Sequence, residues 1–236
     1  MKQSHIATAI ALCLAATVSH ADIISQWNFN GASGTTAPSL GSGSAALIGT
    51  TATFASGNAN GGSSDPDTST SDWGWNLSGF ASQGSGDLSR GAQFSISTVG
   101  WEQLSFSYDM RHSNTSARHE AVLVSTDGVT FTQVAQFSAV QQSDTWYNQR
   151  WVDLSTLAGA ANNSQLQIRV VASFAPGTQG YDASTTGSSY SSTGTWRLDM
   201  VTLQGQVTAV PEPATYATLL LGLFSLGALS ARARRR

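Results

Sequence analysis

Apolar and polar residues alternate without interruption between residues 104 and 110. Leu104, Phe106, Tyr108 and Met110 would lie on one side of an extended chain, with two serines and an aspartate on the other. Because successive side chains of a β-strand point to opposite faces, the alternation predicts a strand with one buried and one solvated face. Antiparallel sheets that cover a core on one side have this pattern.

Shorter segments with the same period extend the prediction across the centre of the chain, and Asp127-Gly128 is a turn signal between two of them. No segment of this region has a convincing helical period. Short strands with turn signals between them predict an all-β fold, a two-sheet β-sandwich of jelly-roll type. The polar stretches 31–62 and 173–194 are predicted to be long loops. The other predicted strands are residues 23–29, 121–124, 129–131, 166–170 and 196–203.

The end of the chain has three parts in a fixed order. Pro211-Glu212-Pro213 is predicted to be extended, because each proline fixes φ and disfavours helix in the preceding residue. Residues 214–231 carry no charge and would span roughly 27 Å as a helix, which matches the hydrocarbon layer of a bilayer. They predict a single transmembrane helix. The positive-inside rule keeps the following basic stop in the cytoplasm, and it consists of Arg232, Arg234, Arg235 and Arg236.

This combination of a Pro-Glu-Pro tripeptide, a leucine-rich helix and an arginine cluster resembles the PEP-CTERM sorting signal over residues 208–236. The resemblance implies an exosortase substrate of a Gram-negative bacterium. It also implies transient anchoring in the inner membrane, cleavage near the tripeptide, and delivery to the cell surface or the extracellular polysaccharide of a biofilm matrix. An ordinary single-pass tail anchor is the alternative, and it requires no Pro-Glu-Pro tripeptide.

Residues 1–21 have the plan of a signal peptide. A lysine is followed by an apolar segment, and small residues precede a predicted cleavage site between Ala21 and Asp22. The single cysteine of the chain, Cys13, lies in the removed segment, so the mature domain has no thiol or disulfide chemistry. The chain is therefore expected to be exported, with residues 22–207 as one β-sandwich ectodomain.

The charge of the mature domain restricts its partners. Between Asp22 and Val210 there are 13 acidic side chains against six arginines and no lysine, a net charge of about −7 that the value of −3 for the whole chain conceals. A lysine-free, acidic surface lacks the basic footprint that nucleic acid requires. Nucleic acid is therefore excluded as the expected partner.

Several segments are similar to the jelly-roll ectodomains that often precede PEP-CTERM tails, and they are residues 104–113, 125–131, 151–154 and 197–202. In that family the last segment commonly carries Asp-Asn, whereas here Asp199 is followed by Met200. Because biochemical function in the family is largely unassigned, the resemblance implies a fold rather than an activity.

Catalytic chemistry finds little support in the sequence. His112 and His119 are the only histidines of the mature domain, and with Glu120 they would lie at the ends of a predicted hairpin loop. Cross-strand neighbours there could share a metal ion or form an acid–base pair, and the alternative is a solvated, polar hairpin end. No Gly-x-Ser-x-Gly elbow is present, and Glu102 is the only other glutamate before the sorting segment. We identify no catalytic residue and keep an extracellular polysaccharide hydrolase as the alternative function.

Two groups of oxygen-bearing side chains are candidates for a structural calcium ion, which prefers carboxylate and carbonyl ligands. One lies in a polar loop that fails the EF-hand template, and the other where the first and last strands of a jelly roll would meet. The first group is Asp65, Asp67 and Asp72, and the second is Asn28, Asn30 and Asp199. The alternative is that these are polar loop and strand-end residues without a metal, and no other cofactor is expected.

Tryptophans are the candidates for sugar binding, because flat aromatic rings can stack on sugar faces. Trp73 and Trp75 are flanked by glycine and polar residues, which favours a loop-borne binding site as much as a place in the core. Four others are predicted to close the core, namely Trp27, Trp101, Trp151 and Trp196. Together the patterns predict an exported surface or matrix protein with a structural or adhesive role and contacts to extracellular polysaccharide.

Overall fold

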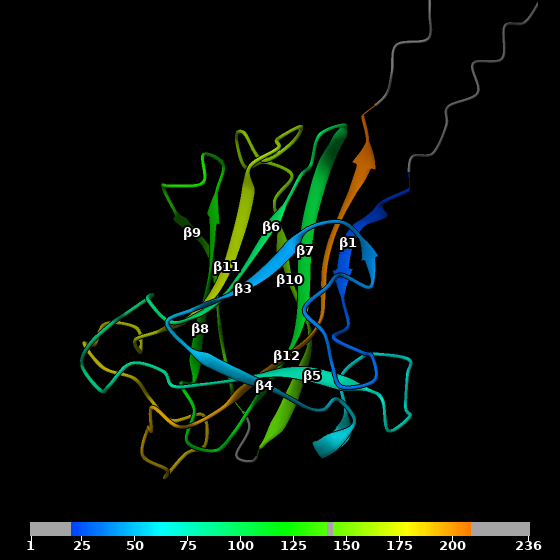
Figure 1. The fold of residues 1–236 in the computed structure, drawn as a ribbon. Coiled ribbons are helices and arrows are strands. Elements are labelled where there is room, and N and C mark those ends of the chain that lie inside the picture. Colours follow the sequence, from blue (N-terminus) through cyan, green and yellow to red (C-terminus); the bar gives the residue numbers. More distant parts are fainter. Residues whose placement is uncertain (1–19, 141–143, 209–236) are drawn as a thin grey trace, which may run out of the picture.

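Two antiparallel β-sheets face each other in the computed structural model, which describes residues 20–140 and 144–208 (Figure 1). Sheet A has the strand order β10 (Thr145–Asp153), β7 (Trp101–His112), β12 (Trp196–Val207), β1 (Asp22–Trp27) and β2 (Leu40–Gly41). It also contains β5 (Trp73–Ser78), which pairs with β12, and β4 (Thr51–Ser56), which pairs with β5. Sheet B has the order β3 (Ser44–Ile48), β6 (Gly91–Ile96), β11 (Leu166–Ser173), β8 (His119–Ser125) and β9 (Thr132–Ser138). A 3₁₀ turn, η1 (Ala59–Gly61), follows β4.

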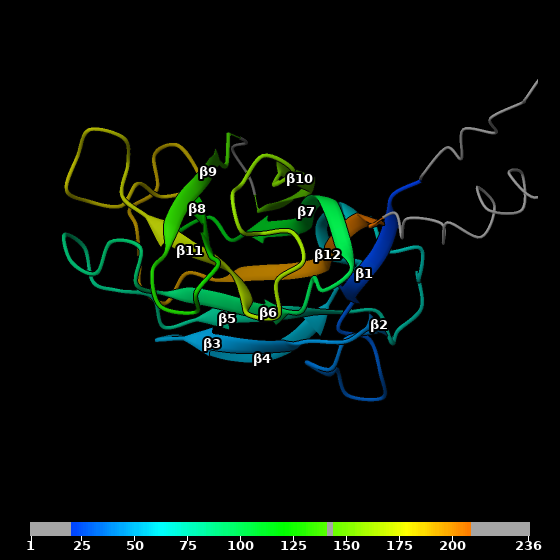
Figure 2. The ribbon, with the colours of Figure 1, turned by 90° about the horizontal axis from the view of Figure 1, so that it is seen from above.

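The predicted all-β, two-sheet sandwich is confirmed by this arrangement. The two longest strands, β7 and β12, pair along the middle of sheet A, and the first strand pairs antiparallel with the last (Figure 2). Strand β1 begins at Asp22 and β12 ends at Val207. Among the described residues, the strands therefore extend from Asp22 to Val207, and the domain bounds 22–207 stay a prediction.

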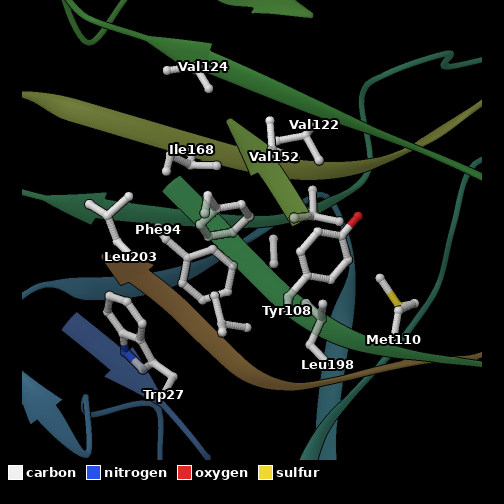
Figure 3. Close-up of a cluster of buried hydrophobic side chains, with 14 of the residues drawn as sticks. Trp27, Phe94, Tyr108, Met110, Val122, Val124, Val152, Ile168, Leu198 and Leu203 are labelled. Atoms are coloured by element: carbon white, nitrogen blue, oxygen red, sulfur yellow. The ribbon is translucent and has the colours of Figure 1, made fainter. Parts of the chain in front are cut away.

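The core lies between the sheets and is built by the period-two pattern of the strands. All four apolar residues of the alternating segment in β7 are at most 1% exposed. They meet Phe94 and Ile168 of sheet B and the Trp27 ring of β1, all pointing into the same interior (Figure 3). Burying each such side chain stabilises the fold by about 1.5–3 kcal/mol before the entropy of ordering is subtracted.

Strand β12 changes its neighbour half-way along its length. Its first residues, from Trp196 to Leu198, pair with β5, whereas the stretch from Val201 to Gly205 pairs with β1. The register with β7 shifts after Asp199, where the backbone of Met200 has a positive φ of 46°. The C-terminal end of β1 and the N-terminal end of β5 therefore lie beside Asp199. The loop after β1 and the loop before β5 meet at the same place.

Three sequence predictions about local structure were wrong. The stretch 31–62 contains β2, β3, β4 and η1 rather than one long loop. Its strands lie toward sheet edges and are largely exposed. β2 has only two residues, and the apolar residues of β3 are consecutive, so neither strand shows the alternation that marks a strand in sequence. The segment 129–131 precedes β9, which begins at Thr132. Residues 113–118 do not close a hairpin, because β7 belongs to sheet A and β8 to sheet B.

The predictions for both ends of the chain lie outside the described residues. These are the signal peptide up to residue 19, the Pro211-Glu212-Pro213 tripeptide, the transmembrane helix 214–231 and the arginine-rich end. Within residues 20–140 and 144–208, no helix has the length and apolar character needed to cross a membrane.

Candidate functional site

The β4–β5 loop, residues 57–72, lies on sheet A where β12 changes its neighbour. It brings Asp65 and Asp72 to Asp199 of β12, and one carboxylate oxygen from each lies within 4.8 Å of the others. We call these three residues the aspartate cluster. All three are buried, with Asp72 2% and Asp199 0% exposed. Carboxylates that converge in this way form the kind of ligand set that a hard cation such as Ca²⁺ accepts.

Hydrogen bonds hold two of the three carboxylates. Asp199 accepts one from the Ser63 hydroxyl at 2.7 Å and one from the backbone N–H of the next residue at 2.7 Å. Asp65 accepts one from the Asn30 side-chain amide at 3.0 Å and one from the backbone N–H two residues later at 2.8 Å. The loop and the strand therefore fix where these two carboxylates lie.

Asp72 lacks such partners. Its Oδ1 atom is buried without a hydrogen-bond partner. None of the ion pairs within residues 20–140 and 144–208 includes a member of the aspartate cluster. The Asp72 carboxylate packs directly on backbone, because a Cβ placed on Gly57 would overlap it. An unpaired buried carboxylate is costly in free energy.

The electrostatics of the cluster reflect this lack of compensation. Burial raises the pKa of Asp199 to about 8, and the charges of Asp65 and Asp72 add to the rise while its two hydrogen bonds oppose it. Burial also raises the pKa of Asp72 to about 6, with contributions from Asp65 and Asp67. Each carboxylate is thus held beside negative charges in a poorly solvated place.

The two calcium candidates of the sequence converge at this one place. Asp65 and Asp72 come from the loop group, and Asp199 from the strand group. Asn30 lies beside them with its amide engaged on both sides, because its Nδ2 donates to Asp65 and its Oδ1 accepts from the Trp73 backbone N–H at 2.6 Å. Asn30 therefore positions Asp65.

Two further members of those groups are placed differently. Asp67 is outside the cluster, and its carboxylate accepts a hydrogen bond from the Ser69 backbone N–H at 2.8 Å. The side chain of Asn28 accepts a hydrogen bond from the backbone N–H of Asn30 at 3.4 Å. A ligand role for Asn28 stays a prediction.

The loop that carries the cluster is fastened to two neighbouring strands. Asp109 of β7 accepts hydrogen bonds from the Ser64 N–H in the loop and from the Gln149 N–H in β10. Gln149 has a positive φ of 57° and lies in a bulge, where the register between β10 and β7 shifts. The Trp146 indole of β10 also donates to the Ala59 carbonyl at 2.8 Å.

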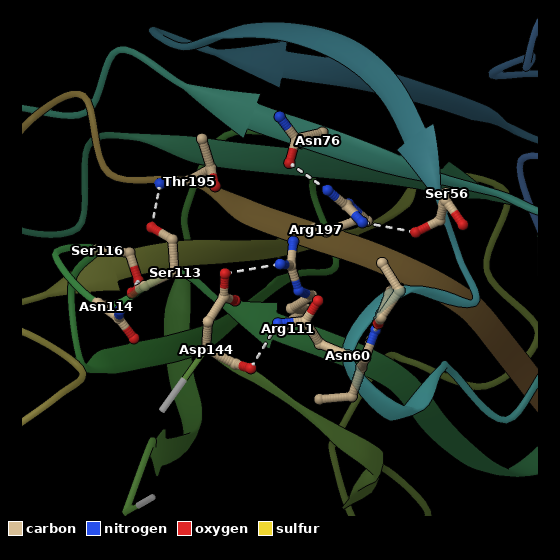
Figure 4. Close-up of polar contacts among 12 residues, drawn as sticks. Ser56, Asn60, Asn76, Arg111, Ser113, Asn114, Ser116, Asp144, Thr195 and Arg197 are labelled. Atoms are coloured by element: carbon tan, nitrogen blue, oxygen red, sulfur yellow. Dashed lines mark hydrogen bonds and ion pairs between the residues drawn. The ribbon is translucent and has the colours of Figure 1, made fainter. Parts of the chain in front are cut away.

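Two arginines that are cross-strand neighbours add to these contacts (Figure 4). Arg111 of β7 forms an ion pair with Asp144 at 2.6 Å, and the Asp144 carbonyl accepts a hydrogen bond from Asn60 of the loop. Arg197 of β12 donates to the Ser56 carbonyl at the end of β4. The arginines therefore hold both the start of β10 and the start of the loop on sheet A.

Some of the tryptophans lie where the sequence predicted them, and others do not. Trp27 and Trp196 are fully buried, which confirms their predicted place in the core. Trp75 is also in the core, 4% exposed and stacked on Phe29 with ring centroids 5.6 Å apart, so it is wrong as a sugar-binding candidate. Trp151 is 58% exposed, so its predicted place in the core is wrong.

Trp73 and Trp101 are half-buried. Trp101 packs against the core, as predicted. The Trp73 indole nitrogen is buried without a hydrogen-bond partner, and its backbone contributes to the loop described above. A sugar-binding role for Trp73 stays a prediction.

Trp151 stands at the outer face of sheet A, on its edge strand β10. Trp151 pairs across the strands with Ser107 of β7. Ser107 pairs in turn with Thr202 of β12, and Thr202 pairs with Gln26 of β1. Cross-strand partners share a face, so one row across the sheet carries the exposed Trp151 indole and the half-buried Ser107 and Gln26. Thr202 is only 4% exposed, and its hydroxyl accepts a hydrogen bond from the Gln26 amide and donates one to the Met200 carbonyl. Sequence could have placed Trp151, because its strand alternates and the apolar Val152 faces inward.

The histidines and Glu120 form a different arrangement from the one predicted. His112 and Glu120 are buried between the sheets, with His112 Nε2 3.1 Å from Glu120 Oε2 and Arg150 Nε 3.0 Å from Glu120 Oε1. His119 lies apart, with its Nδ1 2.7 Å from the Ser138 hydroxyl. A solvated hairpin end was therefore the wrong prediction. In the part of the chain that the structure describes, these residues form no metal-binding group.

Comparison with known protein families identifies the C-terminal segment. Residues 209–236 match the PEP-CTERM protein-sorting motif. The motif indicates an exported protein that is anchored transiently in a membrane before it is processed. The match confirms the sorting motif that the Pro-Glu-Pro tripeptide and the residues after it suggested. No curated protein matches the sequence of the chain.

Among solved structures, the sandwich is similar to carbohydrate-binding jelly-roll domains. The tandem CBM22-1–CBM22-2 domain of Paenibacillus barcinonensis Xyn10C is 15% identical, with a TM-score of 0.49 over 84% of this chain and 49% of that one. The N-terminal cellulose-binding domain of Cellulomonas fimi β-1,4-glucanase C is 15% identical, with a TM-score of 0.35 over 70% of this chain and 90% of that one.

The CBM22-1–GH10 modules of Clostridium thermocellum xylanase 10B, complexed with xylohexaose, are 12% identical to the chain. The TM-score is 0.44 over 80% of this chain and 29% of that one. The chain thus spans about half the length of the Paenibacillus protein and under a third of the Clostridium one. At such low identities the ligands of these proteins remain properties of those proteins alone.

Proposed function

We propose that the chain is an exported, exosortase-processed protein of the cell surface or extracellular matrix, where it binds polysaccharide through the outer face of sheet A. The observation that carries the proposal is the exposed Trp151 ring, which heads a row on the outer face of sheet A with the half-buried Ser107 and Gln26. Sugars offer apolar faces to an aromatic ring and hydroxyls to amide and hydroxyl groups.

The charge of the domain indicates which polysaccharides suit this face. The ectodomain has a net charge of about −7, so it repels polyanionic chains at long range. Its outer row carries no charged side chain between Trp151 and Gln26. Neutral polysaccharides are therefore the expected ligands, and the role is adhesive or structural within a matrix.

The buried state of the acidic side chains argues against the alternative of a polysaccharide hydrolase. Glu120 and Asp109 are at most 1% exposed, and each is already engaged by ion pairs or hydrogen bonds inside the fold. A glycosidase acid must reach the scissile bond. Neither residue is placed to do so.

The test is binding of the full chain in detergent to a panel of neutral and acidic polysaccharides, by affinity electrophoresis and calorimetry. We expect Trp151→Ala to weaken binding of a neutral ligand by about tenfold, or about 1.4 kcal/mol, at an unchanged melting temperature. Val129→Ala is the control, because Val129 is the most exposed large apolar side chain in the described residues and lies outside the row.

Other outcomes would contradict the proposal. Loss of binding in Trp73→Ala but not in Trp151→Ala would move the site to the β5 region. Release of reducing ends from any polysaccharide of the panel would favour the hydrolase.

A further inference from the structure

The three residues of the aspartate cluster lie outside the row of Trp151, and none of them forms an ion pair. Asp65, Asp72 and Asp199 converge from a loop and from a strand near the other end of the chain. No arginine or histidine of the described residues forms an ion pair with them. Arg197, two residues before Asp199, interacts with it electrostatically without forming an ion pair. Three buried carboxylates lie closer to one another than to any ion-pair partner, and a fold retains such a group at a cost in stability.

Asp72 provides an independent indication of a ligand. Asp72 is only 2% exposed. One of its carboxylate oxygens lies within 4.8 Å of an oxygen of each of the other two aspartates. Its Oδ1 atom is buried and receives no hydrogen bond. Buried polar atoms of folded proteins nearly always have a partner, so an unpaired one calls for a missing ion or water.

We propose that the aspartate cluster binds one Ca²⁺ ion, which ties the β4–β5 loop to β12. Calcium takes oxygen ligands at about 2.3–2.6 Å, so oxygens within 4.8 Å of one another can all reach a single ion. Mg²⁺ demands shorter bonds in near-ideal octahedral geometry and retains its waters, which suits fixed, buried carboxylates less well. Asp65 and Asp199 are held in position by the Asn30 amide and the Ser63 hydroxyl.

The place of the cluster explains why an ion is needed there. At Asp199, β12 has left β5 and has not yet met β1, so strand pairing on that side is interrupted. A cation bridging Asp65 and Asp72 to Asp199 would close this gap between the loop and the sheet. The loop also contacts β7 through Ser64 and Asp109, so its release is expected to loosen one face of sheet A while the core stays intact.

The experiment uses the full chain in detergent, stripped of metal with EDTA and titrated with CaCl₂ by calorimetry. We expect one ion per chain and a higher melting temperature. At a free Ca²⁺ concentration about 100 times Kd, the folded-to-unfolded ratio should increase about a hundredfold. Tb³⁺ replaces Ca²⁺ in a second measurement. Its emission should be sensitised by Trp73, which directly follows Asp72, and should be quenched when Ca²⁺ displaces it.

Two isosteric variants make the test specific. Asp72→Asn should weaken Ca²⁺ binding on the order of tenfold or more, because it removes a charged ligand. In EDTA it should melt above the wild type, because it removes one of three repelling charges. Asp67→Asn is the matched control, since Asp67 lies in the same loop but outside the cluster, and its Ca²⁺ affinity should match that of the wild type.

The proposal is overturned if the stripped chain shows no saturable Ca²⁺ binding, or if Asp72→Asn binds Ca²⁺ as the wild type does. A lower melting temperature of Asp72→Asn in EDTA would also overturn it, because the aspartate would then stabilise the fold without a metal. If Asp72→Asn fails to fold, Asp65→Asn takes its place. The calorimetric and Tb³⁺ titrations of the wild type then also test whether the cluster binds Ca²⁺. None of these measurements involves a polysaccharide, so their outcome is independent of the glycan proposal.

Discussion

His119 is a buried histidine at the end of sheet B, away from the interior network of His112. Its Nδ1 lies 2.7 Å from the Ser138 hydroxyl, and its Nε2 lies 3.8 Å from an Asp182 oxygen. Burial lowers its pKa below the usual 6.5; Arg118 acts in the same direction, and Asp182 and Glu120 oppose it. The folded chain therefore binds a proton at this ring less readily than the unfolded chain does.

This shift predicts a dependence of stability on pH. With a depressed folded pKa, the contribution of His119 to stability is present above the unfolded pKa of about 6.5 and is lost as the pH falls below it. Urea unfolding between pH 7.5 and 5.5 should show a steeper loss for the wild type than for His119→Asn. Equal slopes in the two proteins would contradict the assignment.

At the scale of elements, the two sheets are joined by charge as well as by apolar packing. Glu120 of β8 in sheet B contacts His112 of β7 and Arg150 of β10, both in sheet A. The Arg150 guanidinium also lies over the Phe137 ring of β9, 5.0 Å from its centroid. A buried ion pair contributes modestly in itself, but the loss of one partner leaves an uncompensated charge.

We therefore expect Glu120→Gln to lower the free energy of unfolding by about 3–5 kcal/mol. Equilibrium urea unfolding measures the change. Glu102→Gln is the control, because Glu102 is half-buried at the start of β7, and its substitution should stay within about 0.5 kcal/mol. A loss below about 1 kcal/mol for Glu120→Gln would mean that packing alone joins the sheets at this point.

At the scale of the whole molecule, the sandwich is followed by a sorting motif over residues 209–236. The described residues supply both sheets and the apolar core between them. We expect a domain with its own core to keep its fold when it is separated from such a signal. That property suits a protein that is cleaved after export.

Processing predicts the ends of the mature chain. Intact-mass analysis of the protein from its host should show a form that begins at Asp22 and ends near the Pro211-Glu212-Pro213 tripeptide. A strain without the exosortase should yield a C-terminus at Arg236 instead. The same uncut C-terminus in both strains would indicate a plain membrane anchor and would remove the matrix role.

Strand positions followed from sequence for β1, β7, β8, β11 and β12, and were missed for β5, β6 and β10. In β7 the alternation placed Leu104 and Met110 in the core, because side-chain direction in a strand has a period of two residues. The same rule failed for β2 and β3, which expose apolar side chains such as Leu40 and Leu47 and therefore show no contrast between faces. The same period holds around Trp151, which is 58% exposed beside the buried Val152.

The sequence by itself determined the all-β class, the charge of the domain and the sorting motif, because each depends on local order or on composition. Only the tertiary structure decided that Asp65 and Asp72 meet Asp199, and that Glu120 is buried against His112. These contacts depend on which strands pair, and on the point where β12 changes its partner from β5 to β1. Strand pairing results from the packing of the whole core, and no local pattern of residues records it.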